Sequence, residues 1–159
     1  MDNLELLTNA FDRKARKKLW IPQHILENPE LEILPVITWM HNKLPLGYIM
    51  YNTGDKMIGI VMSATKMSKT IGTSRACMCD LCFQVYSATQ IQMFSYQKAE
   101  NKTVSLYLCS NLDCEKRILD PNTSKLYSTR ETLTKEEKIF RYRENVERFF
   151  LTHVQSENH

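Results

Sequence analysis

Apolar residues recur every three or four positions at both ends of the chain, whereas its middle contains short runs with β-strand character. Near the start, Leu4, Leu7, Phe11 and Ala15 share one face of a helix, so their spacing predicts a helix over residues 4–18. Near the end, Thr134 precedes an apolar stripe and has Glu137 at capping-box spacing. We therefore expect a final helix from residue 134 to about residue 154. The stripe comprises Ile139, Tyr142, Val146, Phe149 and Phe150.

Two β-hairpins are predicted between these helices. The runs "GYIMY" (47–51) and "MIGIVM" (57–62) flank the turn "NTGDK", which contains a glycine and has a length that hairpins use. The runs "IQMFSY" (91–96) and "VSLYL" (104–108) flank the polar loop "QKAENKT". The proline-rich segment "ENPELEILPV" (27–36) is expected to be irregular or extended.

Helices that flank short antiparallel strands indicate an α+β fold. The 159 residues suit a single domain over residues 1–159. Within it we expect two sub-lobes. Residues 1–70 would carry the first helix and hairpin, and residues 71–159 the second hairpin and final helix.

Composition indicates a soluble globular protein, with 43% hydrophobic and 25% charged residues. The start of the chain carries acids where a signal peptide would carry bases, and no apolar run approaches the roughly 18 residues of a membrane span. We expect a cytoplasmic protein without a membrane partner. In that reducing compartment, clustered thiols are more often metal ligands than disulfides.

All five cysteines fall into two short clusters. Cys79 and Cys82 form a C-x-x-C turn, and Cys109 and Cys114 form a second pair with four residues between them. Four thiolates in two such pairs are typical of one tetrahedral structural zinc ion. Cys77 is the surplus thiol, and its spacing from Cys82 also makes it an alternative to Cys79.

The second predicted hairpin would return the second cysteine pair to the first, and Cys114 begins a short helical stretch, "CEKRIL". A knuckle, a hairpin and a ligand at a helix start are the parts of a treble-clef zinc finger. Such a four-sulfur site is closed, whereas a catalytic zinc needs an open position. His24, His41, His153 and His159 are scattered without ligand spacing, so the sequence indicates no enzyme.

The run "RKARKK" (13–18) concentrates positive charge at the end of the first predicted helix. It is either a solvated helix end or a docking patch for an acidic partner. The net charge of +3 would fall to about +1 once four thiolates bind Zn²⁺. A strong nonspecific affinity for nucleic acid is therefore not implied.

The segments "CDLCFQVYSATQIQMFSY", "VSLYLCSNLDCEKRI" and "LTKEEKIFRYRENVERFF" resemble the treble-clef domain of elongation factor G-binding proteins, the FusB type of fusidic acid resistance protein. More loosely, "FDRKARKKLWIPQ", "ITWMHNK" and the first hairpin follow the order of the same domain, so the resemblance covers nearly the whole chain. It implies a non-catalytic protein that binds elongation factor G through a zinc-bearing domain and helps it to leave the ribosome.

The resemblance also implies aromatic contact residues beside the finger and on the last helix, which Tyr107 and Phe149 match. Either residue could instead belong to the core, because Tyr107 lies on an alternating strand and Phe149 on an apolar stripe. The chain departs from the family at Met78, where the family has an aromatic residue, and at Val104, where it has a basic one. The helical N-terminal domain of the resistance proteins has no counterpart in these residues.

Three hypotheses of different classes follow. The first is a binding protein for elongation factor G, with no small-molecule substrate. The second is a zinc-stabilised module that binds ribosomal RNA or another nucleic acid through the basic run. The third is an enzyme or redox protein with a reactive thiol at Cys77, for which neighbouring Arg75 is the only supporting feature.

Overall fold

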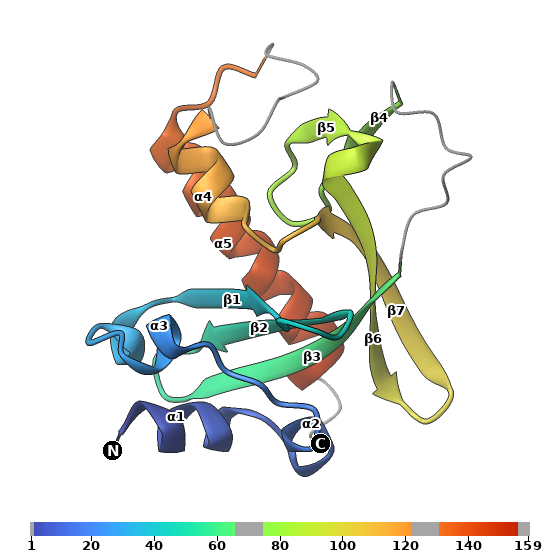
Figure 1. The fold of residues 1–159 in the computed structure, drawn as a ribbon. Helices are drawn as coiled ribbons and strands as arrows, with labels where there is room; N and C mark the ends of the chain where they lie inside the picture. Colours follow the sequence, from blue (N-terminus) through green and yellow to red (C-terminus); the bar gives the residue numbers. More distant parts are fainter. Residues whose placement is uncertain (1, 66–74, 122–130, 156–159) are drawn as a thin grey trace.

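The structure, a computed structural model, describes residues 2–65, 75–121 and 131–155. Its main sheet has five antiparallel strands in the order β1-β2-β3-β6-β7. These strands are β1 (Val36–Met40), β2 (Leu46–Asn52), β3 (Met57–Thr65), β6 (Ile91–Ala99) and β7 (Lys102–Cys109). A two-stranded ribbon, β4 (Ala76–Met78) and β5 (Val85–Ser87), lies beyond one end of this sheet (Figure 1). The predicted α+β class is confirmed.

The helices are short except for the last. They are α1 (Asn3–Ala10), α2 (Arg13–Arg16), α3 (Gln23–Leu26), α4 (Cys114–Leu119) and α5 (Lys135–Phe149). Two 3₁₀ turns, η1 (Leu31–Ile33) and η2 (Ala88–Gln90), precede strands, and a π-helical turn, η4 (Phe150–Val154), continues α5.

Both predicted hairpins are present, and the strands extend beyond the predicted runs. In the first, Ile49 of β2 faces Ile60 of β3. In the second, strand pairing extends into the predicted polar loop, because Ala99 pairs with Lys102. The hairpins are joined by pairing of β3 with β6, where Ser63 faces Ser95. Strand β1 and the small ribbon have no counterpart among the predicted elements.

The prediction of one helix over residues 4–18 is wrong, because the chain breaks at Phe11. Phe11 has an extended backbone, with φ −98° and ψ 144°, and its ring is buried against Trp39 and Tyr48. Asp12 then starts α2 by accepting a hydrogen bond from the Ala15 amide at 2.7 Å. Arg16 bridges the break, because its Nε donates to the carbonyl oxygens of Thr8 and Phe11.

The two faces of the sheet have different covers (Figure 1). Helix α1 and its neighbouring segments cover one face of β1–β3, where Leu7 and Phe11 pack with Tyr48. Helix α5 lies on the opposite side, where Val146 and Phe150 pack with side chains of β2, β3 and β6. Because side chains alternate along a strand, Tyr48 belongs to the first core and Ile49 to the second.

Helix α5 begins as its sequence predicts. Thr134 accepts from the Glu137 amide at 3.1 Å, and the Glu137 carboxylate accepts from the Thr134 amide at 3.2 Å. Of the stripe residues, Tyr142, Val146, Phe149 and Phe150 are buried.

The main sheet crosses residue 70, the boundary between the two predicted sub-lobes, through the β3–β6 pairing. The division of the domain into sub-lobes 1–70 and 71–159 remains a prediction. Among the described residues, no helix combines the length and apolar character that crossing a lipid bilayer requires.

Candidate metal centre

Four cysteines from one turn, one strand and one helix meet at one buried point. Cys79 and Cys82 lie in the turn that follows β4, which we call the knuckle (residues 79–82). Cys109 is the last residue of β7, and Cys114 is the first residue of α4. The β6–β7 hairpin therefore returns the second pair to the first, as the treble-clef arrangement requires.

The distances among the four sulfurs fit a tetrahedral zinc ion. All four Sγ atoms lie within 4.8 Å of one another, with Cys79 and Cys114 at 3.7 Å and Cys82 and Cys109 at 3.8 Å. Zn–S bonds of about 2.3 Å in a tetrahedron place the sulfurs about 3.8 Å apart. No other cluster of metal-ligand side chains was found in the described ranges.

Each cysteine pair lies in or beside a tight backbone turn. The Cys82 amide points at the Cys79 sulfur at 3.5 Å, and the next amide, that of Phe83, donates to the Cys79 carbonyl at 2.9 Å. Phe83 and Leu112 have positive φ values of 62° and 53°, a region that non-glycine residues seldom adopt. Each such residue closes a tight turn next to its cysteine pair.

The pKa values of two of the buried thiols, Cys79 and Cys114, are shifted in opposite directions. Burial raises the pKa of Cys79, but hydrogen bonds from Cys109, Cys114 and Cys82 outweigh burial and hold that pKa well below its usual value. Hydrogen bonds with Cys109, Cys79 and Cys82, together with burial, place the pKa of Cys114 well above its usual value. Cys79 is therefore favoured as a thiolate over Cys114, and a divalent cation is the usual partner of clustered buried thiolates.

A buried cation beside the cysteines was missed by sequence reasoning. Arg117 on α4 is buried, pairs with Asp113 at 2.8 Å and donates to the Gln90 carbonyl at 2.9 Å. Its guanidinium lies over the Tyr86 ring at 4.9 Å. Burial lowers the pKa of Arg117, but Cys109 and Asp113 raise it more, so it stays charged. The only signal in the sequence was an arginine three residues after Cys114.

Helix α5 is fastened to the knuckle by two polar side chains that the apolar stripe does not reveal. Asn145 is buried, and its Nδ2 donates to the Leu81 carbonyl at 2.7 Å. Arg141 donates to the Cys82 carbonyl at 2.8 Å and stacks on Phe83 at 5.6 Å from the ring centroid. These contacts satisfy knuckle carbonyls that the turn leaves without backbone partners.

Replacing Asn145 by alanine is expected to lower the free energy of unfolding by about 1–3 kcal/mol, because the buried Leu81 carbonyl loses its donor. The measurement is urea denaturation of the zinc-loaded protein. Glu144→Ala is the matched control, since Glu144 is the exposed neighbour on α5. Equal stability of the two variants would contradict the role given to Asn145.

Cys77 lies apart from the four clustered sulfurs. It is half-buried on β4, and its sulfur is not in the metal-ligand cluster of the described residues. Burial raises its pKa, Asp80 and Cys79 add to that effect, and Arg75 only partly opposes it. A raised pKa disfavours the thiolate on which the reactive-thiol hypothesis depends.

The two predicted contact residues differ in exposure. Tyr107 is 44% exposed, and its backbone exchanges hydrogen bonds with Asp80 of the knuckle, both at 2.7 Å. Phe149 is 7% exposed and packs against Tyr96, Phe150 and His153. Its edge helps to line a shallow groove of about 330 Å³ together with Phe83 and Leu106.

The fold is similar to that of a resistance protein of known structure. The chain is similar to the structure of the fusidic acid resistance protein FusC, with 21% sequence identity and a TM-score of 0.53. The match covers 77% of this chain and 54% of that one, so it spans about half of FusC and supports the fold alone. No protein of curated function matches the chain in sequence.

Residues 5–153 match the family described as FBP C-terminal treble-clef zinc-finger, which covers almost all of the described fold. This family is named for its zinc finger. The family match and the four converging sulfurs together indicate one structural zinc ion. The chain therefore belongs to the FBP C-terminal treble-clef zinc-finger family.

Proposed function

We propose that the chain is a non-enzymatic cytoplasmic protein that binds elongation factor G and promotes its release from the ribosome. The family match and the similarity to a fusidic acid resistance protein support this proposal. The single observation that carries it is a group of exposed apolar side chains around the rigid, buried cysteine knuckle.

The zinc ion in this proposal is held by Cys79, Cys82, Cys109 and Cys114. Their tetrahedral spacing and complete burial support the assignment. Four sulfur ligands leave no position for a substrate or an attacking water. The zinc would therefore stabilise the shape of the contact surface and would take no part in a reaction.

The proposed contact surface lies around the knuckle. Met78 directly precedes Cys79 and is 47% exposed, and Phe83 directly follows Cys82 and is 37% exposed. Tyr107 is joined to the knuckle through Asp80. Large exposed apolar and aromatic side chains on a rigid support are the residues that anchor protein interfaces.

Phe149 has a different role in this surface from that of Tyr107. Because it is almost completely buried, it would form the floor of the groove and keep Phe83 and Leu106 in place. Its truncation would remove core contacts, so loss of binding in Phe149→Ala would not separate contact from folding. Tyr107 is therefore the more informative position.

Tyr107→Ala is expected to weaken binding to elongation factor G by about 1–3 kcal/mol, because a truncated aromatic anchor loses its buried contact area. The measurement is titration calorimetry of the zinc-loaded chain against elongation factor G. Ile33→Ala is the control, since Ile33 is exposed on η1, which lies outside the proposed surface. Zinc content and thermal unfolding should match the unmodified protein in both variants.

Absence of complex formation at tens of micromolar would overturn the proposed function, because an interface of ordinary size gives micromolar affinity or better. Equal affinities of the Tyr107→Ala variant and the unmodified chain would place the contact surface elsewhere. A modest loss of affinity at raised salt is expected, since apolar contacts are screened less than charge pairs.

A further inference from the structure

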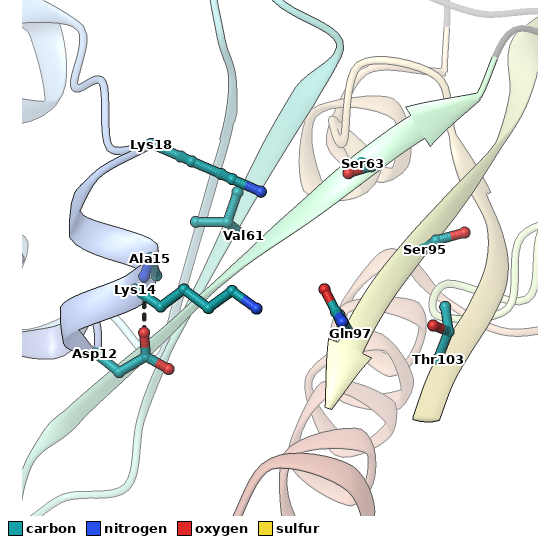
Figure 2. Close-up of a pocket in the computed structure, with 9 residues that line it drawn as sticks. All are labelled: Asp12, Lys14, Ala15, Lys18, Val61, Ser63, Ser95, Gln97 and Thr103. Atoms are coloured by element: carbon teal, nitrogen blue, oxygen red, sulfur yellow. Dashed lines mark hydrogen bonds between the residues drawn. The ribbon is translucent and has the colours of Figure 1, made fainter. Parts of the chain in front are cut away.

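One face of the main sheet is only half covered. Tyr48 and Val61, which face each other across β2 and β3, belong to the core beneath α1 and α2. The same face continues onto β6 and β7, because Ser63 faces Ser95 and Ser95 faces Ser105. Helix α2 ends there and lies beside the uncovered strands (Figure 2). We call the edge between them, lined by Lys14, Lys18, Ser63, Ser95 and Gln97, the step.

The part of this open face beside α2 is polar. The Ser95 and Ser105 hydroxyls lie 3.0 Å apart, and the next pair on the same face is Gln97 with Thr103. Thr103, Ser105 and Gln97 are exposed. These side chains offer hydroxyl and amide groups in a row, with the two-residue spacing of a strand.

Two lysines line the other side of the step. Lys14 on α2 and Lys18 after it extend toward the strands, and with Ser63, Ser95 and Gln97 they enclose a groove of about 240 Å³ (Figure 2). Within the described part of the chain, neither ammonium group has an ion-pair or hydrogen-bond partner. Asp12 is the one acid of the groove, and it accepts the Ala15 amide hydrogen bond.

The positive charge continues past this groove. A second groove of about 490 Å³ lies on the other side of Asp12 and Ala15, which line both grooves. Arg16, Lys56 and Lys98 line the second groove. Cations from α2, from the residue before β3 and from β6 therefore line a path longer than one small anion.

We propose that this step binds the phosphodiester backbone of single-stranded nucleic acid, with Lys14 and Lys18 on phosphates. Ser95, Gln97 and Thr103 would contact sugar and phosphate oxygens. Lysine, serine, threonine and glutamine side chains are the usual donors to a nucleic-acid backbone. A groove beside an open sheet face can follow an extended strand over several nucleotides.

The composition of the groove favours this ligand over an acidic protein. The apolar lining of the groove between Lys14 and Gln97 consists of Val61 and Ala15, and only the second groove has aromatic side chains, Phe11 and Tyr96. The centre of a protein interface is usually rich in aromatic and large apolar residues. The proposal does not rest on the binding of elongation factor G, for which we propose the knuckle surface at Met78, Phe83 and Tyr107, further along β7 from the groove.

The test is fluorescence anisotropy of a labelled 12-nucleotide single strand, once as RNA and once as DNA, titrated with the zinc-loaded chain at several salt concentrations. In Lys14→Glu/Lys18→Glu we expect affinity at low salt to fall by about tenfold or more, with a salt slope smaller by roughly 1.4, for two lost phosphate contacts. A preference for RNA or for DNA identifies the biological source of the strand, and binding to either supports the site.

The matched control is Arg13→Glu/Lys17→Glu. Both double variants change the net charge from +3 to −1, because each replacement removes two units of charge. Arg13 and Lys17 are exposed on the same basic run but line neither groove. We expect this control to weaken binding by less than about threefold, since it lacks direct phosphate contacts.

Equal losses in the two double variants would overturn the site, because they would show that diffuse charge alone attracts the strand. Absence of binding by the unmodified chain at low salt would also overturn it. Equally tight binding of polyglutamate of matched charge would contradict the assignment to phosphodiesters. Calorimetry of both variants against elongation factor G separates this result from the proposed function.

Discussion

Replacing Cys109 by serine is expected to release the zinc ion and unfold the part of the domain around the knuckle. Cys109 is completely buried, with its sulfur 3.8 Å from that of Cys82. A serine hydroxyl is a poor zinc ligand, and structural zinc sites of this type contribute about 10–16 kcal/mol of apparent binding free energy to folding. The loss would be as large as the total stability of an ordinary domain, about 5–15 kcal/mol.

The effect reaches beyond the ligands because the cysteines are part of the larger core. Cys79 and Cys114 pack in the same hydrophobic cluster as Phe94 of β6 and Val146 of α5. When the sulfurs separate, α4 and α5 lose their anchor on the knuckle. Near-ultraviolet circular dichroism should therefore lose the aromatic signal of this cluster.

Metal analysis and circular dichroism of Cys109→Ser measure the expected loss, with Cys77→Ser as the control. Cys77 has the same side chain but lies outside the cluster of sulfurs, so its variant should keep about one zinc per chain and a native spectrum. A folded Cys109→Ser protein with full zinc content would contradict the proposed ligand set. Loss of zinc in Cys77→Ser would show that Cys77 is the ligand in place of Cys79.

Replacing Phe11 by alanine is expected to lower the free energy of unfolding by about 3–5 kcal/mol, as for other buried Phe→Ala changes. Phe11 is 1% exposed, and its ring lies edge-on to Trp39 and Tyr48, each at a centroid distance of 6.1 Å. The ring also fills the space above Gly59, where a Cβ atom would lie only 2.6 Å from it. Its removal leaves a cavity that the rigid strands cannot close.

Urea denaturation of the zinc-loaded protein measures this effect, and Phe140→Ala is the matched control. Phe140 is 65% exposed on α5, so the same truncation there should change the free energy of unfolding by no more than about 0.5 kcal/mol. A similar small effect for Phe11→Ala would mean that the α1 segment is not part of the cooperative core. Zinc content should stay unchanged in both variants, because neither residue lies in the cysteine cluster.

Local patterns were sufficient for the features whose interactions are close in sequence. The capping box at Thr134 and the stripe up to Phe150 depend on contacts one helical turn apart, so the final helix could be predicted from them. The turn at Gly54 and the alternation around it likewise predicted the first hairpin. The cysteine pairs could be grouped because the hairpin between them brings their ends together.

Features that depend on distant partners were beyond the sequence. The break at Phe11 interrupts a regular helical pattern, because its ring is buried against Trp39 and Tyr48, which are distant in sequence. The pairing of Ser63 with Ser95 joins two hairpins that the sequence predicts separately. Arg117 and Asn145 resemble ordinary surface residues of amphipathic helices, and only packing shows what each of them bonds.

The sequence by itself determined the α+β class, the hairpins, the last helix and the pairing of cysteines into a zinc finger, because each rests on chemistry within a short stretch or on one hairpin return. The tertiary structure alone decided that Tyr107 is exposed while Phe149 is buried, and that Lys14 and Lys18 border an open polar part of the sheet. An apolar stripe or a basic run shows which residues share a face. Which face is covered depends on where the neighbouring helices end, and that is set by the whole core.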